Sequence, residues 1–296
     1  MLLDSLKRIL HEPPPVMAFE ISEAGIAAAR IGPHAELEFR PLKPGVLEVS
    51  PLKENIADPD ELFLAVRSLA ERQGTRKGRD VALILPDYAT RIAVLDFDEF
   101  PSDPKEQLAL VRFRLKRSVP FDVEAAAVGY WAQPHTGKKC DVVVMMTPLE
   151  IVSRYEAPFR LAGLNPGFVT ASALAALELA ADGGLSVLAK ITGRALTVLV
   201  RQNSTVKLVR CLEVPSAEFE DISAVLLPTF VFVEDQLGAR AERLILCGFG
   251  RHTEDAQRRF EVELEVAVEP LRSALGVAGE HNAGLLGYLR SLARYN

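Results

Sequence analysis

Histidine, cysteine and serine are the residue types that most often bind metals or act as nucleophiles, and this 296-residue chain does not space them for either role. It contains no HExxH pair, no CxxC, no GxSxG elbow and no GxGxxG loop. The cysteines, Cys140, Cys211 and Cys247, lie in or beside apolar runs, which predicts buried free thiols. The five histidines are scattered through predicted loops, and we expect them at the surface. Metal and nucleophile chemistry are therefore not indicated.

Two pairs of acidic residues have the close spacing that a glycosidase-like carboxylate pair could use. Asp96 and Asp98 stand at the end of a predicted strand, and Glu218 and Glu220 stand at the start of a predicted helix. Carboxylates in such places commonly face solvent or the positive end of a helix dipole. We therefore expect neither pair to carry chemistry.

A predicted helix over residues 105–117 is the most basic in the chain and the best surface candidate for recognition. Its Arg112, Lys116 and Arg117 could contact acidic lipid headgroups or an acidic peptide while the apolar positions pack inward. A solvated face whose cations suit the C-terminal end of the helix dipole explains the same pattern. The second interpretation needs no partner and is the simpler one.

Composition limits the class of protein. The chain is 49% hydrophobic and 25% charged, which is typical of a globular protein and excludes a largely disordered one. Its net charge of −6, from 34 basic and 40 acidic residues, gives no general attraction to nucleic acids. No apolar run reaches about 18 residues without a charge, so we expect a soluble protein. The odd number of cysteines suits a reducing cytoplasm.

The predicted elements occur in the same order twice. Hairpin-like strands over residues 17–30 open the first series, and similar strands over residues 186–213 open a second series that ends in a helix at 282–293. This order predicts two related α/β lobes that pack against each other. We divide the chain into an N-terminal helix with a proline linker (1–15), a first lobe with an inserted subdomain (16–183) and a second, truncated lobe (184–296).

Several segments together resemble the type IV pilus assembly protein PilM family and, more distantly, the cytoplasmic domain of the type II secretion protein GspL. Residues 107–122 resemble a helix that ends in the family's isoleucine-proline-aromatic corner. Residues 141–144 precede the next helix, and 160–166 (RLAGLNP) are similar to the family's AGLKP junction. The resemblance covers about residues 15–290 and implies a two-lobed actin-like (ribonuclease H-like) ATPase fold with a reduced second lobe.

The resemblance implies that residues 17–30 form the first of two phosphate-binding hairpins. The family pattern G-I-D-I-G corresponds here to residues 18–22 (AFEIS), so Glu20 replaces the aspartate near the metal and Ser22 replaces a glycine. Glycine matters there because it lets backbone N–H groups approach a phosphate closely. The first hairpin therefore keeps an acidic side chain and loses its glycines.

The second hairpin, residues 186–201, departs further from the family. The expected D-I-G becomes Lys190, Ile191 and Thr192, and Gly193 is displaced by one position. A lysine cannot ligate Mg²⁺ or position an attacking water as a carboxylate does. Lys190 could pair with a phosphate, which leaves weak nucleotide binding open. A solvated lysine at a strand end is the simpler expectation.

The family's adenosine turn corresponds to residues 248–250 of this chain. Phe249 would place a ring where the nucleoside lies unless it faces away. A tight turn between a buried strand and a helix explains Gly248 and Gly250 without a ligand. The segment between the second hairpin and the long helix is much shorter than in PilM, so we expect the subdomain that closes over the nucleotide to be largely absent. Water would then not be excluded from a bound phosphate.

We therefore expect a protein with no catalytic residues and no required cofactor, with ATP and Mg²⁺ doubtful as ligands. The resemblance implies a cytoplasmic adaptor, peripheral to the inner membrane, that serves a type IV pilus or type II secretion machine. Its partner would be a short cytoplasmic segment of a PilN-like membrane protein, held in a groove of the first lobe. Two alternatives stay open: an ATPase or sugar-kinase relative that uses Glu20 in place of the aspartate, and a self-associating protein that forms filaments.

Overall fold

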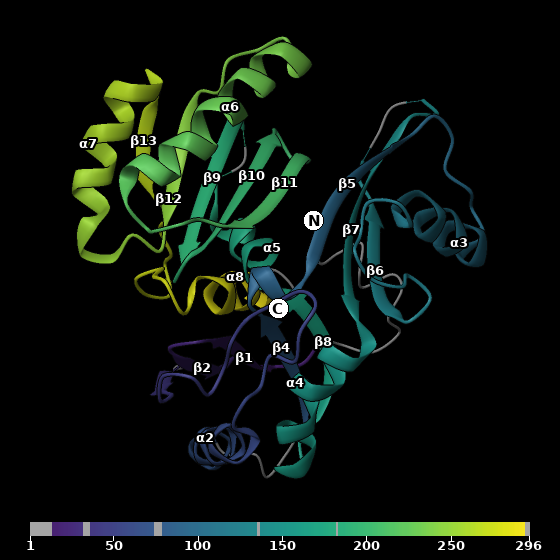
Figure 1. Ribbon diagram of the computed structural model, residues 1–296, viewed down its shortest axis with the longest axis vertical. Coiled ribbons are helices and arrows are strands. Elements are labelled where there is room, and N and C mark those ends of the chain that lie inside the picture. The colour runs from purple at the N-terminus through teal and green to yellow at the C-terminus, as the bar shows by residue number, and fades with distance from the viewer. Residues whose placement is uncertain (1–13, 32–35, 74–78, 135–136, 182, 294–296) are drawn as a thin grey trace.

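The computed structural model describes residues 14–31, 36–73, 79–134, 137–181 and 183–293. Two five-stranded sheets with the same topology form its two lobes (Figure 1). The first sheet has the order β3-β2-β1-β4-β8 and the second has the order β11-β10-β9-β12-β13. In each, a three-stranded antiparallel meander is extended by two strands parallel to its first strand. The repeated order of elements that the sequence predicts is confirmed.

The hairpin strands β1, β2, β9, β10 and β11 fall close to the predicted ranges, 17–30 and 186–213. The first sheet consists of β1 (Met17–Ser22), β2 (Gly25–Arg30), β3 (Leu37–Pro41), β4 (Asp80–Leu85) and β8 (Asn165–Ala171). The second consists of β9 (Leu185–Thr192), β10 (Ala195–Gln202), β11 (Thr205–Glu213), β12 (Arg243–Cys247) and β13 (Ala267–Pro270). The N-terminal helix predicted within residues 1–15 lies outside the described residues, apart from Pro14 and Pro15.

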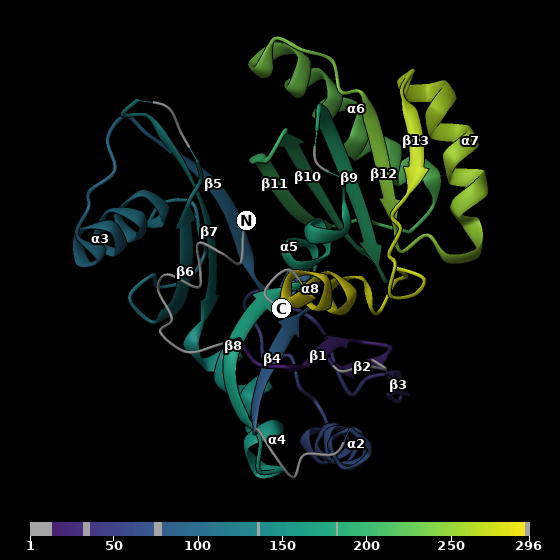
Figure 2. The same cartoon turned by 180° about the vertical axis from the view of Figure 1, so that it is seen from behind.

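Helices cover both faces of each sheet. On the outer faces lie α2 (Pro59–Arg72) and α4 (Leu149–Leu161) in the first lobe, and α6 (Phe219–Leu237) and α7 (Thr253–Leu264) in the second. Between the two sheets lie α5 (Ser172–Ala176) and α8 (Ala283–Ala293), as both Figure 1 and Figure 2 show. The lobes therefore meet through the last helix of each.

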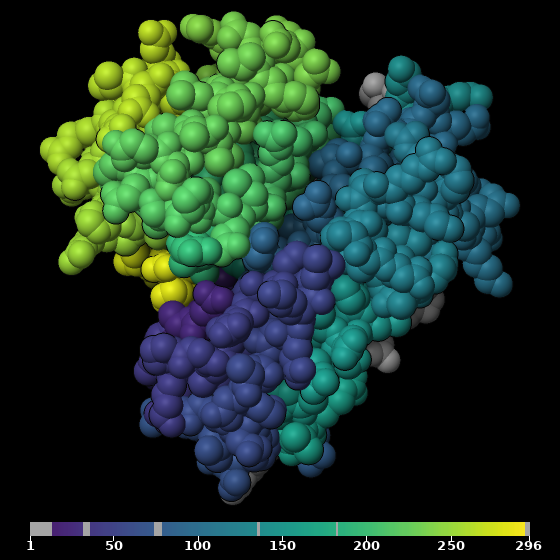
Figure 3. Space-filling model, viewed as in Figure 1, coloured from purple at the N-terminus to yellow at the C-terminus, as the bar shows by residue number. Residues whose placement is uncertain are grey.

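The inserted subdomain follows β4 and forms a separate three-stranded antiparallel sheet. It consists of β5 (Arg91–Phe97), α3 (Pro104–Leu115), β6 (Ala126–Ala132) and β7 (Cys140–Pro148), with strand order β5-β7-β6. Asp103 caps α3, accepting hydrogen bonds from the backbone N–H groups of Lys105 and Glu106, and Pro104 takes the first helical position. The space-filling view in Figure 3 shows the second lobe seated on the first lobe and against this subdomain.

One hydrophobic cluster joins the inserted subdomain, the second lobe and the two helices between the lobes. Trp131 and Val143 of the subdomain share this cluster with Leu199 of β10 and with residues of α5 and α8. The Gln133 side-chain amide also exchanges two hydrogen bonds with the backbone of Val206 in β11, at 2.8 and 2.6 Å. The lobes are thus held together by a buried core as well as by the chain that links them.

Alternation along the strands decides which way the candidate residues point, because successive side chains of a strand face opposite sides of the sheet. In β1, Phe19 and Ile21 pack with α2 and α4, whereas Ala18 packs with α8. Glu20 therefore faces the interior between the lobes. By the same alternation in β9, Lys190 faces that interior, because Leu188 packs in the cluster shared with α5 and α8.

The close crossing of α5 and α8 depends on glycine. A Cβ at Gly287 would overlap the carbonyl oxygen of Ala175. We expect Gly287→Ala to lower the free energy of unfolding by about 1–3 kcal/mol through overpacking, measured by urea denaturation. Gly129→Ala in β6 is the control, because a Cβ there would meet nothing within 4 Å. Equal losses in the two variants would contradict the packing argument.

Candidate functional site

The cleft between the lobes contains a hollow at the turns of the two predicted phosphate hairpins, and a second hollow adjoins it on the second lobe. A hollow of about 290 Å³ is lined by residues of both lobes, among them Ser22, Thr192 and Gly193. A second hollow of about 430 Å³ also includes Gly193 and is lined by Gly248 and Gly250. The fold therefore brings together five of the seven positions that the resemblance assigns to the nucleotide site. Glu20 and Lys190 line neither hollow, and the side chain of each is buried, with 2% of its surface exposed.

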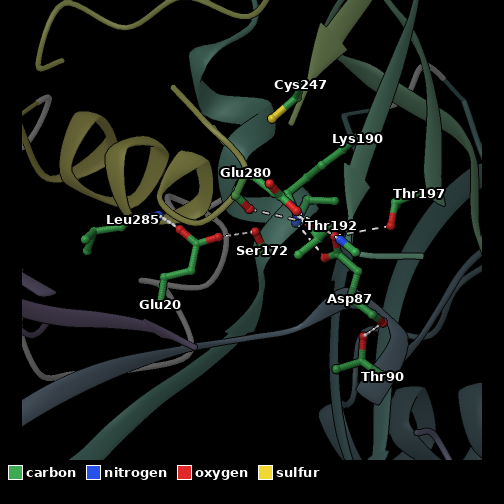
Figure 4. A network of polar contacts seen from close by, with 12 residues as sticks. Glu20, Asp87, Thr90, Ser172, Lys190, Thr192, Thr197, Cys247, Glu280 and Leu285 are labelled. Carbon is green, nitrogen blue, oxygen red and sulfur yellow. Dashed lines mark hydrogen bonds and ion pairs between the residues drawn. The ribbon is translucent and has the colours of Figure 1, made fainter. Parts of the chain in front are cut away.

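Glu20 is a helix cap. One of its carboxyl oxygens, Oε2, accepts a hydrogen bond from the backbone N–H of Leu285, at 2.7 Å, in the first turn of α8. The other, Oε1, accepts a hydrogen bond from the hydroxyl of Ser172 at the start of α5. The first turn of a helix has N–H groups without intrahelical partners, and a carboxyl group there satisfies them and complements the dipole. Glu20 thus ties β1 to both helices between the lobes (Figure 4).

Asp87, in the turn after β4, also has both of its carboxyl oxygens engaged in hydrogen bonds. Its Oδ1 accepts a hydrogen bond from the backbone N–H of Ala173, at 2.7 Å, at the start of α5. Its Oδ2 accepts from the Thr197 hydroxyl, at 3.2 Å, and lies 3.0 Å from Nζ of Lys190. No motif or spacing in the sequence pointed to Asp87 as a functional position. The resulting ion pair connects the first lobe to the second.

Lys190 is not the solvated lysine that the sequence suggested, and that expectation was wrong. Its ammonium group donates hydrogen bonds to Asp87 and to the hydroxyl of Thr192, at 3.0 and 2.9 Å (Figure 4). Alternation along β9 is the physical reason, because it points Lys190 inward from a strand that is buried on both faces. A lysine in such a place is found almost only when it is paired.

Lys190 and Glu20 occupy equivalent positions in the two hairpins, each two residues before the last residue of its strand. Burial is the largest single influence on Lys190 and lowers the pKa of its ammonium group, but the charge and hydrogen bond of Asp87, together with the influence of Cys247 and Glu20, raise that pKa above its ordinary value. Burial raises the pKa of Glu20, although the ammonium group of Lys190 and the hydrogen bond from Ser172 act in the opposite direction. The site therefore contains the charged, ion-paired ammonium group of Lys190 and the carboxyl group of Glu20, which stays protonated to a higher pH than usual.

The backbone N–H of Gly193, which a phosphate would need, is already engaged. It donates to Oε1 of Glu280 at 3.1 Å, and Gly193 has a left-handed φ of 58°. Glu280 lies in the segment before α8 and also lines the larger hollow. Glu23 and Glu213 line the smaller one. Arg194 also lines the smaller hollow, where it is paired with Glu213, and Arg251 lines the larger one, so carboxylates and cations both lie near the turn of the second hairpin.

The glycine turn after β12 is explained by packing. A Cβ at Gly248 would overlap the carbonyl oxygen of Ile191, so only glycine lets β12 end this close to β9. Phe249 also lines the larger hollow, but its side chain is buried in the core of the second lobe, where its ring centroid is 6.1 Å from that of Phe260. The turn therefore needs no ligand to account for its glycines.

The three basic residues proposed as surface contacts lie far from the cleft, on α3 and just after it. Arg112 is engaged within the subdomain, where its guanidinium group lies 2.6 Å from the carboxylate of Glu124 and donates to the carbonyl oxygen of Ala126 at 3.2 Å. Lys116 and Arg117 are exposed. Of the three, Arg112 is therefore already engaged within the subdomain, whereas Lys116 and Arg117 remain exposed.

The remaining candidates behave largely as the sequence predicts. Cys140 and Cys247 are buried free thiols and Cys211 is half-buried, and burial raises the pKa of the Cys247 thiol to about 12. The side chains of Asp96 and Asp98 are 91% and 94% exposed. Within the described ranges, no group of three or more His, Cys, Asp or Glu side chains could hold a metal ion. In that same part of the chain, no helix is long and apolar enough to cross a bilayer.

Comparison with known proteins shows the fold. No protein-family model and no curated protein matches the chain. A structure of the PilM-PilN type IV pilus biogenesis complex aligns with 19% identity and a TM-score of 0.73, covering 93% of this chain and 97% of that one. A Bacteroides thetaiotaomicron protein of actin-like ATPase fold and unknown function aligns with 12% identity and a TM-score of 0.58, covering 92% and 94%.

The cytoplasmic domain of EpsL, an inner-membrane component of the type II secretion system of Vibrio cholerae, aligns with 14% identity and a TM-score of 0.52, covering 94% of each chain. The resemblance to PilM and to the cytoplasmic domain of a type II secretion protein is thus confirmed at the level of fold. The chain has the two-lobed actin-like ATPase fold that the sequence predicts.

Proposed function

We propose that this protein is a non-catalytic adaptor of the actin-like fold, which binds a cytoplasmic segment of a PilN-like membrane protein in an inner-membrane pilus or secretion assembly. The observation that carries the proposal is the buried ion pair of Lys190 and Asp87, 3.0 Å apart. It links the two lobes across the cleft with groups that belong to the chain itself. Such an ion pair supports a two-lobed structure whose lobes keep their arrangement without bound nucleotide.

The residues of the cleft do not fit Mg²⁺ and a triphosphate. Glu20 caps α8 from a buried position, Lys190 is committed to Asp87, and the Gly193 N–H is committed to Glu280. A bound triphosphate would have to displace the Glu280 carboxylate from the Gly193 N–H, and it would lie near Glu23 and near Arg194, whose charge is already paired with Glu213. These contacts support an adaptor over the ATPase alternative.

The likeness to the PilM-PilN complex supports the choice of partner. In that structure a protein of this fold is paired with PilN, and the EpsL domain comes from an inner-membrane component of a secretion system. We therefore place this chain at the cytoplasmic face of the inner membrane, held there through its partner. Affinity for such a peptide is expected to come from a few buried side-chain anchors and from main-chain pairing.

Two titrations test the proposal. Calorimetry with peptides from the cytoplasmic tails of membrane proteins encoded beside this chain is expected to show saturable binding, unchanged by Mg-ATP. Mg-ATP alone is expected to give no heat and no shift of the thermal midpoint. The second readout is sensitive, since a ligand at about 100 times its Kd adds roughly 2.7 kcal/mol to the free energy of unfolding.

The outcomes separate the candidate functions. Micromolar binding of Mg-ATP with turnover would replace the adaptor by the ATPase alternative. If no adjacent membrane-protein tail binds, the adaptor proposal is wrong whatever the nucleotide does. Peptide binding that requires Mg-ATP would retain the partner but overturn the idea that the lobes are bridged by the chain's own side chains.

A further inference from the structure

The outer face of α3 presents an exposed aromatic ring, and two cations follow it at the end of the helix. Phe113 is 75% exposed, far more than is usual for an aromatic side chain. Lys116 caps the C-terminus of α3, and Arg117 lies in the turn directly after it, three and four residues beyond Phe113 in the sequence. Both are exposed, and neither has an ion-pair partner among the residues that the structure describes. We call these three residues the Phe113 knob.

The helix that carries the Phe113 knob, α3, is firmly packed in the inserted subdomain. Val111 and Leu115, on the opposite face of α3, are buried in the core of the inserted subdomain. Asp103 caps the N-terminus of the helix, and the ion pair of Arg112 with Glu124 fixes its side. A ring held by a fixed helix loses little conformational freedom on binding, so it can act as an anchor.

A groove of about 250 Å³ lies on the second lobe, between the C-terminal half of α6 and the end of α7. Leu227, Phe230, Val231 and Leu264 give it an apolar lining. Leu227 and Val231, four residues apart on one face of α6, are 46% and 59% exposed. We call this the α6–α7 groove. Its width and apolar lining suit a single aromatic side chain.

The rim of the α6–α7 groove is acidic. Glu234, Glu263 and Glu265 line it together with a single cation, Arg240, which lies 3.3 Å from Glu234. Glu263 is paired with Arg259. Glu265, exposed at the left-handed residue that ends α7, has no ion-pair partner among the described residues. The groove therefore presents an apolar lining with a net negative border, which complements an apolar side chain flanked by cations.

We propose that the Phe113 knob of one copy of this chain occupies the α6–α7 groove of a second copy. The ring of Phe113 would cover Leu227 and Val231, and Lys116 and Arg117 would meet Glu265 and Glu234. Figure 1 places α3 on the inserted subdomain and α6 on the second lobe. The contact therefore joins two different surfaces, and unless the copies close into a pair or a ring it continues into a chain.

Sedimentation velocity over a concentration series up to about 100 µM tests the contact, since it detects association with a Kd in the micromolar range. The wild type is expected to show an increasing sedimentation coefficient. Phe113→Asp and Val231→Asp are each expected to sediment as monomers, with association weakened at least about tenfold. Leu149→Asp is the matched control, since Leu149 is 50% exposed on α4, away from both surfaces.

Mixing the two monomeric variants is the sharpest form of the test. Phe113→Asp keeps an intact groove and Val231→Asp keeps an intact knob, so an equimolar mixture is expected to form one-to-one pairs and nothing longer. The charge match has its own test. K116E/R117E is expected to abolish association, and the added substitutions E234K/E265K are expected to restore it.

Three results would overturn the proposal. The first is a wild type that stays monomeric over the whole series, and the second is a mixture of the two variants that fails to pair. The third is association that both variants retain. If the monomeric wild type bound a basic amphipathic peptide through Val231, the groove would belong to another protein. If it bound anionic vesicles through Phe113, the knob would belong to a membrane.

Discussion

Lys190→Met is expected to lower the free energy of unfolding by about 3–5 kcal/mol, because it leaves the Asp87 carboxylate buried without its cation. Asp87 is 5% exposed and has no other cationic partner in the described part of the chain. The loss is measured by urea denaturation at neutral pH. Methionine keeps the length and apolar stem of the side chain, so the effect reports the charge and not a cavity.

A double variant and a control make this prediction specific. Lys190→Met combined with Asp87→Asn is expected to recover most of the loss, since removing both members of a buried pair is often nearly neutral. Lys207→Met is the control, because its ion pair with Asp141 also joins the second lobe to the inserted subdomain but is 26% and 30% exposed. It is expected to cost no more than about 1 kcal/mol. A Lys190→Met loss as small as the control's would show that the pair does not hold the lobes.

Local patterns in the sequence were enough to predict the order of elements. Alternating apolar residues are typical of strands, and Asp58 with Pro59 and Asp103 with Pro104 are typical helix starts, as the structure has them. Composition alone is a poorer guide to residues 171–181. Their many alanines favour one continuous helix, but α5 ends at Ala176 and continues only as a 3₁₀ turn. The chain must enter β9 within a few residues, and this connection overrides the helix propensity of alanine.

The candidate site could be predicted only in part, because its partners are distant in the sequence. The contact of Lys190 with Asp87 spans 103 positions, and that of Glu20 with the N–H of Leu285 spans 265. No periodicity or motif reports such contacts. One signal was available: Lys190 stands in a strand whose neighbours on both sides are apolar, and a charge in a fully buried strand requires a partner. That reasoning would have predicted burial and pairing, although not Asp87 as the partner.

Glu20→Gln is expected to leave the fold intact, and its stability advantage over the wild type is expected to grow as the pH rises. A glutamine oxygen can accept the N–H of Leu285 while its amide group donates to the hydroxyl of Ser172, so both contacts survive. Glu20→Ala, by contrast, leaves both groups without a partner, at about 1–3 kcal/mol for each. The Glu20→Ala variant therefore measures the hydrogen bonds, and the Glu20→Gln variant isolates the charge.

The direction of the pH effect follows from the raised pKa of Glu20. In the unfolded chain this carboxyl group ionises near its ordinary pKa of 4.5, whereas burial keeps it protonated in the fold to a higher pH. The contribution of the protonated Glu20 to the free energy of unfolding is then fully present below pH 4.5 and is lost as the pH rises through the folded pKa. Glutamine does not titrate, so urea denaturation at a series of pH values should show the two proteins alike in acid and diverging towards neutral pH. If Glu20 instead ligated Mg²⁺, Mg-ATP would stabilise the wild type and not Glu20→Gln, and this result would restore the ATPase alternative.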